Sequence, residues 1–261
     1  MKRVIIIIIG LLMLIGIVGC GNKQISTIYA NGIMKEYKLA INDTIKEIRF
    51  AMPAKLYLSS EESDKIRWTI DENLAEHIHI SFEQGVLIIE TNQGVLFDLK
   101  NSGGIRFYVG TNGLRKMSTS GMTEVISQGV LQVETLQVAM SGISTISQMQ
   151  VNAKSIDINI KDLSMIKNAI FNANELNMNV NGISTMTASS ESAVDSVNIE
   201  CSGTSNIDIG NIKAILGTVK ISGSSIIRVN IQNLTSNISG SSQIINLADE
   251  QSTQKHTIPH F

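Results

Sequence analysis

Ser120-Gly121-Met122-Thr123-Glu124-Val125 is the first of seven similar hexapeptides in the second half of the 261-residue chain. Each has Gly, or once Asp, at its second position, Ser or Thr two residues later, and an apolar residue at its end. The other six begin at Ser141, Lys161, Asn181, Ser202, Ser222 and Ser239, in steps of 21, 20, 20, 21, 20 and 17 residues. A period of this length is typical of a solenoid, whose units bury their apolar faces only by stacking.

The residues before each turn alternate between apolar and polar. Counting back from the Gly position, apolar residues stand at −2, −4 and −6, as at Ile160, Ile158 and Ile156 before Asp162. The same parity continues after the turn, at Ser164 and Ile166. A two-residue period indicates a half-buried strand. Each coil is therefore predicted to contain a strand, a tight turn and a second strand.

The turn and a second bend set the predicted shape of the coil. Gly at six of the seven turns, with Asp162 at the seventh, indicates a backbone with positive φ or a close backbone approach. A column of small residues about halfway round suggests a second bend: Ala153, Ala173, Ala193 and Ala214. Two bends and the usual hand of crossovers predict an all-β fold, a right-handed parallel β-helix of about seven 20-residue coils over residues 117–247.

The flanking regions carry weaker patterns. Residues 38–116 contain several alternating runs separated by polar turn clusters, which predicts a β-rich, antiparallel lead-in segment before the solenoid. Within it, Asp71–Glu76 is expected to form about one helical turn. Residues 248–261 lose the apolar columns and are expected to form a C-terminal cap or tail.

The N-terminus has the pattern of an export signal. Lys2 and Arg3 precede an apolar run from Val4 to Val18, and Gly19-Cys20 follows. This boundary resembles the lipoprotein box, which implies a signal peptide over residues 1–19, cleavage before Cys20 and lipidation of Cys20, with residues 20–37 as a tether. The alternative is an uncleaved anchor helix, but the run is shorter than the roughly 18–20 apolar residues that a membrane span needs.

The repeats resemble a known family. The Ser-Gly-x-Ser-x-Ile units, preceded by a strand such as Leu114–Thr119, are similar to the putative auto-transporter adhesin head family, the GIN domain of bacterial surface proteins. The upstream strands Ile45–Phe50 and Leu87–Glu90 extend the resemblance to about residues 41–247. It implies a β-helical surface domain with an adhesive role and no established catalytic residues. Lys161-Asp162-Leu163 departs from the family pattern, because the turn Gly is missing there.

Composition and single residues give no support for nucleic-acid binding, a reactive thiol or a metal site. The net charge of −2 gives no footprint for nucleic acid or for an anionic membrane. Cys201 falls in the apolar −2 column and is expected to be an inert core thiol. His77 and His79 lie two apart on an expected strand without a third ligand, and His256 and His260 lack a helix that would pair them, so no metal and no cofactor is predicted.

The repeated polar columns show no arrangement typical of an active site. The serine column has no matching His or acid, since residues 117–247 contain no His, so a hydrogen-bonding role is expected. The acidic side chains of the coils stand at different offsets: Asp157, Asp162, Glu175, Glu191, Asp195, Glu200 and Asp208. Outward amides recur at Asn159, Asn177, Asn179, Asn198 and Asn237. A solvated face explains these amides, and contact with a carbohydrate or protein surface is the functional alternative.

The sequence therefore predicts a non-enzymatic, lipid-anchored envelope or cell-surface protein that acts in adhesion or envelope interaction through its repeats. Its expected partners are the membrane, through acyl chains on Cys20, and an extended carbohydrate or protein ligand, with no nucleic acid. Two alternatives stay open: a polysaccharide-processing β-helix enzyme, since such reactions need clustered carboxylates, and a structural protein that assembles end to end through an open coil.

Overall fold

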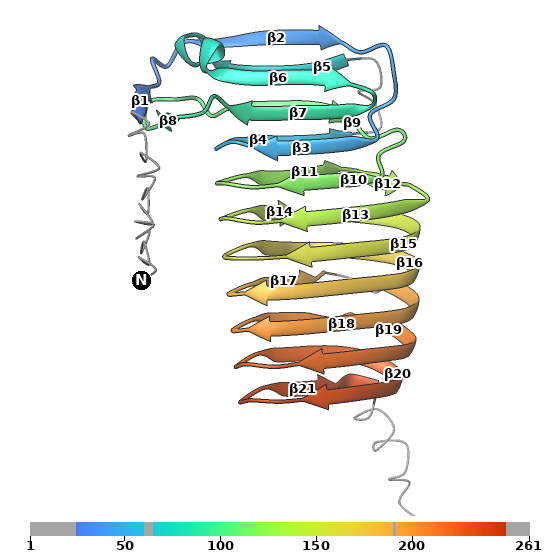
Figure 1. Cartoon of the computed structure of the whole chain (residues 1–261). Helices are drawn as coiled ribbons and strands as arrows, with labels where there is room; N and C mark the ends of the chain where they lie inside the picture. Colours follow the sequence, from blue (N-terminus) through green and yellow to red (C-terminus); the bar gives the residue numbers. More distant parts are fainter. Residues whose placement is uncertain (1–24, 60–64, 190–191, 249–261) are drawn as a thin grey trace, which may run out of the picture.

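The computed structural model describes residues 25–59, 65–189 and 192–248. Within them the chain is almost entirely β-structure and forms a parallel β-solenoid of about six coils, close to the seven that were predicted. Figure 1 shows the coils stacked from β10 and β11 to β20 and β21, with an N-terminal group of strands above them. The predicted fold class is confirmed.

Parallel pairing holds consecutive coils together. The strands before the Gly turns stack in the order β10 (Lys116–Thr119), β13 (Thr135–Met140), β15 (Gln150–Ile160), β16 (Met165–Gly182), β18 (Ser192–Gly203), β19 (Asn206–Ile221) and β20 (Ile226–Ile238). After the turns, pairing runs through β11 (Glu124–Gln128), β14 (Thr145–Ser147), the start of β16, β17 (Thr185–Ala188), the starts of β19 and β20, and β21 (Gln243–Asn246).

A third paired stretch follows the second bend. β12 (Val130–Gln132) pairs with residues 150–152 of β15, and these pair with residues 170–172 of β16. Each coil therefore has a short third side in addition to the two sheets suggested by the sequence. The predicted alanine column holds only in part, because Ala173 pairs with Val194 and not with Ala193. The coil has a 21-residue step here, and its extra residue lies before Val194.

The N-terminal strands enter the stack out of chain order. β3 (Glu47–Ala51) lies between β7 (Val86–Thr91) and β10, and it is parallel to both. In the same way β4 (Lys55–Ser59) lies between β9 (Arg106–Gly110) and β11. The lead-in segment thus adds two parallel layers of its own to the solenoid.

Antiparallel strands cover the N-terminal end. β6 (Ile78–Glu83) pairs antiparallel with β7, β5 (Lys65–Asp71) with β9, and β2 (Met34–Ala40) with β5. This agrees with the predicted antiparallel segment, and the 3₁₀ helix η1 (Glu72–His77) lies where one helical turn was expected. β1 (Ser26–Tyr29) pairs with β8 (Val95–Asp98), so part of the expected tether is a strand.

Aromatic rings fill the N-terminal cap. Tyr37 stacks on Trp68 at 5.6 Å between ring centroids, and Trp68 stacks on Phe107 at 6.0 Å. Phe50 meets Phe107 edge-on at 5.5 Å, so the rings join β2 and β5 to the first coils. Beside them, buried Asp71 accepts hydrogen bonds from Gly32 N and Ser102 Oγ. These contacts give the solenoid a closed N-terminal end.

The core follows the predicted parity. The −4 and −6 positions of the middle coils, such as Ile158 and Ile156, are at most 3 % exposed, and the apolar position after the turn is fully buried, as at Ile166. The exceptions are in the last coil, where Ile238 is 49 % exposed and Leu234 and Ile244 are only partly buried. An interior position in this fold is covered only when coils lie on both sides of it.

The turns stack backbone on backbone. At each step, the N–H of the residue after the turn position donates to the turn carbonyl of the preceding coil, as from Ile183 to Asp162 and from Thr204 to Gly182. The Gly positions all have positive φ, and a Cβ added at Gly203 would lie 2.4 Å from Gly182 O. Asp162 keeps the same conformation at φ 62°, and its carboxylate accepts a hydrogen bond from Gly142 N at 2.9 Å. The turn is therefore maintained without Gly.

The assigned parity makes a first prediction. Ile158→Asp places an unpaired carboxylate between two coils and should lower the free energy of unfolding by several kcal/mol, on the order of 3–5. Asn159→Asp, one residue along on the exposed side, should change it by less than about 0.5 kcal/mol. Urea unfolding followed by circular dichroism measures both. Equal losses in the two variants would contradict the parity.

A second prediction separates backbone strain from close packing at the turns. Gly121→Ala should lower the free energy of unfolding by about 1–2 kcal/mol, because it places a Cβ at positive φ while no other atom lies within 4 Å of that Cβ. Gly203→Ala also places a Cβ at positive φ, and in addition it forces the stacked turns apart. It should therefore be clearly less stable than Gly121→Ala in the same unfolding assay. If the two variants have equal stability, the turns are not held in backbone contact.

Candidate functional site

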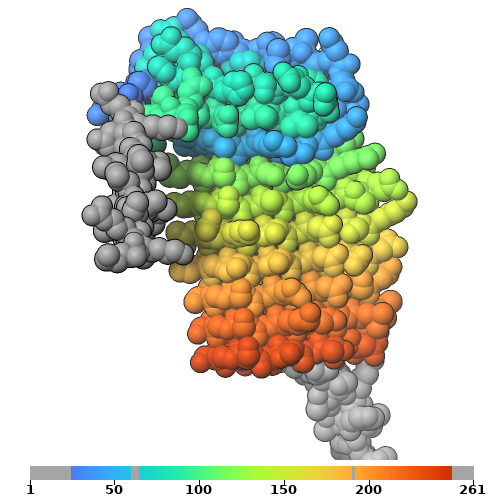
Figure 2. All heavy atoms as spheres, viewed as in Figure 1, coloured from blue at the N-terminus to red at the C-terminus, as the bar shows by residue number. Residues whose placement is uncertain are grey.

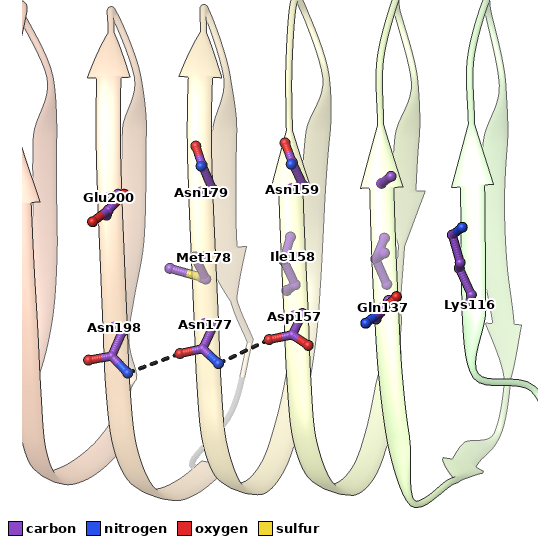
Figure 3. A pocket seen from close by; sticks show the side chains of 12 residues that line it. Lys116, Gln137, Asp157, Ile158, Asn159, Asn177, Met178, Asn179, Asn198 and Glu200 are labelled. Atoms are coloured by element: carbon purple, nitrogen blue, oxygen red, sulfur yellow. Dashed lines mark hydrogen bonds between the residues drawn. The ribbon is translucent and has the colours of Figure 1, made fainter.

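The outward side of the strands before the turns carries a surface with several shallow hollows. We call it the outer face; it consists of the −3 and −5 side chains from β10 to β20. A shallow depression of about 490 Å³ lies in its middle. It is lined by Lys116, Gln137, Val138, Ala139, Asp157, Ile158, Asn159, Asn177, Met178, Asn179, Asn198 and Glu200. Figure 3 shows these side chains arranged in rows across neighbouring coils.

One row is a hydrogen-bonded ladder at the −5 position. Asn177 Nδ2 donates to Asp157 Oδ1 at 2.9 Å, and Asn198 Nδ2 donates to Asn177 Oδ1 at 2.9 Å (Figure 3). Because every bond runs from one coil to the preceding coil, all three side chains are fixed at the spacing of the coils, about 4.8 Å. The ladder is a preorganised row of polar atoms at regular intervals.

The second row, at −3, is less constrained. Asn159 and Asn179 are exposed, and no side-chain hydrogen bond is found for either among the described residues. Glu200 bonds Lys220 Nζ at 2.8 Å, and this hydrogen bond raises the pKa of Lys220. The two amides thus lie free beside the ladder, where they are able to donate to and accept from a bound molecule.

Further hollows lie along the outer face on both sides of the depression, and we call this line of hollows the strip. Towards the cap, a hollow of about 390 Å³ contains Arg49, Ser120 and Lys161. Towards the last coil, another of about 340 Å³ contains Lys220 and Asn237. These three hollows lie along one side of the stack, and Figure 2 shows how regularly the coils succeed one another. The outer face therefore suits a long partner better than a small molecule.

Charges of both signs are interspersed along the strip. At its cap end, Glu47 accepts from Arg49 Nε at 2.7 Å and lies 3.4 Å from Lys116 Nζ. The hydrogen bond from Arg49 is the main cause of a lowered pKa at Glu47, and Lys116 adds to it. The described part of the strip consequently has no strong potential of one sign that would select a highly charged partner.

The serine column is buried and structural. Ser144, Ser205 and Ser225 are at most 4 % exposed. Ser225 Oγ donates to Gly203 O at 3.2 Å and accepts from Ser205 N at 3.0 Å, so one hydroxyl bonds two backbone groups of the preceding turn and joins two successive coils. With no His among residues 117–247, these hydroxyls have neither access to a substrate nor a base.

The acidic candidates are dispersed. Asp157 belongs to the amide ladder, Asp162 to a turn, Glu200 to the Lys220 pair, and Asp208 bonds Arg228 at 3.1 Å. Asp157 and Glu200 line one depression, yet they stand two coils apart and each has its own partner. Glu175 and Asp195 lie away from this depression, and Glu191 is outside the described residues. The described carboxylates thus form no acid–base pair.

The remaining candidates offer no reactive centre. Cys201 is 4 % exposed, and burial raises the pKa of its thiol, which keeps the thiol protonated. His77 ends η1 while His79 lies in β6, so the two do not share a strand as expected. In the described ranges, no three His, Cys, Asp or Glu side chains come together as a metal would need. His256 and His260 lie outside those ranges.

The predicted signal peptide and lipidation site precede the described residues. Residues 1–19 and Cys20 are outside the described part of the chain. In the part that is described, no helix is long and apolar enough to cross a membrane.

The amide ladder is the feature that residue types alone did not single out. Its signal was nonetheless present: Asp157, Asn177 and Asn198 occupy the same −5 offset in three consecutive coils. The sequence placed all three on the outward side, but could not show which side chains bond one another and which amides remain free. That choice depends on side-chain rotamers within a stack whose spacing is already set.

Comparisons with known proteins agree on one fold. A family described as "Putative auto-transporter adhesin, head GIN domain" matches residues 45–249. A putative adhesin of Parabacteroides merdae has a TM-score of 0.72 at 16% identity, covering 84% of this chain and 98% of that one. A putative lipid binding protein of Parabacteroides distasonis has a TM-score of 0.67 at 18% identity, covering 85% and 99%. No curated protein sequence matches the chain.

Proposed function

The chain belongs to the putative auto-transporter adhesin head GIN domain family, and on that basis we propose that it is a non-enzymatic, lipid-anchored adhesin whose outer face binds an extended polymer. Family and fold support a surface, adhesin-like role. The observation that carries the proposal is the amide ladder of Asp157, Asn177 and Asn198 beside the free amides of Asn159 and Asn179.

The chemistry of the strip suits a glycan chain. Amides both donate and accept hydrogen bonds, as sugar hydroxyls do, and the strip offers them at every coil through its middle. The balanced charges favour a partner of low charge. Each contact is weak on its own, since a hydrogen bond exchanged with water contributes about 0.5–1.5 kcal/mol net. Useful affinity therefore requires a partner that spans several coils.

The same geometry argues against catalysis. Hydrolysis or elimination on a polysaccharide needs two carboxyl groups, or a metal with a base, facing one bond. The described carboxylates are spread along the stack, and most of them have hydrogen-bond partners of their own. The similar solved structures are described as putative adhesins or as a putative lipid binding protein, and none of these descriptions is of an enzyme.

The anchoring part of the proposal rests on the N-terminal sequence. Lys2-Arg3, the apolar run and Gly19-Cys20 form a lipoprotein signal, and an exported location agrees with the adhesin family. Acyl chains on Cys20 would hold the protein at a membrane, with about 0.8 kcal/mol contributed by each buried CH₂ group. The β-helix would then be exposed outside the membrane in which the acyl chains are buried.

Binding to the outer face is testable by valency. A long neutral glycan immobilised on a biosensor should bind the chain far more tightly than a disaccharide of the same sugar does. Asn179→Ala should weaken binding to the polymer about two- to tenfold, and a second change on the neighbouring coil, Asn198→Ala, should weaken it further. Asn174→Ala, which removes an exposed amide outside the lining of the depression, serves as the matched control.

Two results would contradict this proposal. Equal affinity for polymer and disaccharide would mean that a single coil suffices. Turnover on a panel of glycans and esters that disappears in Asp157→Asn or Glu200→Gln would establish an enzyme instead. Tight binding to an extended protein, with none to any glycan, would show that the ligand of the outer face is a protein and not a glycan.

Lipidation has its own test. The full chain, expressed in a bacterium that processes lipoproteins, should incorporate a labelled fatty acid, and Cys20→Ser should abolish this incorporation. The variant should also leave the detergent-soluble membrane fraction or remain there only as an uncleaved precursor. Label in the Cys20→Ser form would refute lipidation at Cys20.

A further inference from the structure

The tip of each Gly turn carries one exposed side chain, directly after the turn position. Four successive tips are large and apolar: Met122, Ile143, Leu163 and Ile183, at 63 %, 54 %, 48 % and 63 % exposure. The next three are Thr204, Ser224 and Ser241. We call the first four the apolar edge. They span three coil steps, about 14 Å. The fold does not require apolar residues here, since hydroxyl residues serve at the other three tips.

The stacked backbone holds this edge in line. The tip N–H groups of Ile143, Leu163 and Ile183 each donate to the turn carbonyl of the coil before, at 2.9 to 3.0 Å. The four side chains therefore project from one rigid line rather than from separate loops. An exposed apolar row of this kind commonly marks a contact surface.

A hollow adjoins the upper end of the apolar edge. It has a volume of about 550 Å³, and its apolar lining includes Pro53, Leu99, Ile105, Met122 and Ile143. Leu99 follows β8, which is paired with β1, the first strand of the described chain. Figure 1 shows β1 and β8 on the same side of the stack as the Gly turns. The apolar edge and the start of the described chain thus lie on one side.

The position of Cys20 connects this edge with a membrane. Only four residues separate Cys20 from Ile25, the residue before β1, so the chain allows Cys20 to be at most about 18 Å from Ile25. Ile25 and Leu96, at this same end, are themselves 65 % and 56 % exposed. A lipid at Cys20 would bring this side of the stack to the bilayer surface. Tethering raises the local lipid concentration, so a weak apolar contact becomes occupied.

We propose that the apolar edge of Met122, Ile143, Leu163 and Ile183 rests in the interfacial layer of the membrane to which Cys20 is anchored. This inference depends on the lipid anchor proposed above. Charges near the edge have both signs, Lys55 paired with Glu124 at 3.0 Å and Lys161 next to Asp162, so anionic lipid is not required. The solenoid axis then runs along the membrane, and the polar tips from Thr204 onward contact the polar headgroup layer.

Quenching by brominated lipid tests the contact. The lipidated full chain is reconstituted in phosphatidylcholine vesicles with bromine on the acyl chains, carrying Met122→Trp or Ile183→Trp. Asn179→Trp, on the outer face of the same coil as Ile183, is the matched control, and the signal of native Trp68 is subtracted. The two edge tryptophans should be quenched several-fold more strongly than the control. Equal, background-level quenching in all three would overturn the contact.

Flotation of the vesicles separates this inference from the anchor. If the chain floats and the edge tryptophans stay unquenched, the anchor stands and the contact is wrong. If it does not float, both are wrong. An edge tryptophan whose emission shifts with protein concentration in the absence of vesicles would assign the edge to a second copy of the chain, which also overturns the proposal.

A second variant changes the edge without disturbing the turns. Met122→Ser, Ile143→Ser, Leu163→Ser and Ile183→Ser together give these tips the residue type present at Ser224 and Ser241. The combined variant should unfold in urea like the original chain and still float, while Ile25→Trp in its background should lose most of its quenching by brominated lipid. Unchanged quenching of that tryptophan would show that the edge does not hold the domain against the bilayer.

Discussion

The contact between successive Gly turns determines the rest of the structure. Each turn carbonyl accepts a hydrogen bond from the next coil, and at Gly182, Gly203, Gly223 and Gly240 an added Cβ would lie within 2.3–2.5 Å of a backbone oxygen. The spacing of the coils is therefore set by backbone atoms and not by side-chain size. The side-chain columns therefore repeat at the same spacing, and these columns are the apolar residues, the serine hydroxyls, the amide ladder and the row of tips.

Much of this could be predicted because the fold is repetitive. The apolar parity, the turn position and the need for positive φ at Asp162 follow from comparison of the seven copies, and the structure agrees at each. The places of β3 and β4 could not be predicted, because Met52-Pro53-Ala54 replaces the Gly turn there and removes the repeat signal. The partners of β3 lie 39 and 69 residues away along the chain and those of β4 lie 51 and 69 residues away, so tertiary fit decides the pairing.

The candidate site was predictable to a smaller extent. Outward positions and their amide content follow from parity alone, but the bond from Asn177 to Asp157 and the shape of the depression depend on side-chain rotamers. The tips after the turns were visible in the sequence as Met122, Ile143, Leu163 and Ile183. Their significance required knowing that they are exposed and that β1 begins on the same side. The alternation of residue types predicts which side chains point outward, but only the fold shows which segments lie next to them.

The insertion of β3 between β7 and β10 has a mechanical consequence. Coils further along pair with neighbours about 20 residues away, so a pull at the C-terminal end unzips them one after another. A pull at the N-terminal end meets a different arrangement, because β3 is hydrogen-bonded on both edges to strands from later in the chain. Two ladders must break together before that layer yields. The molecule is thus reinforced at the end through which an anchored protein would carry load, and it is compliant at the other.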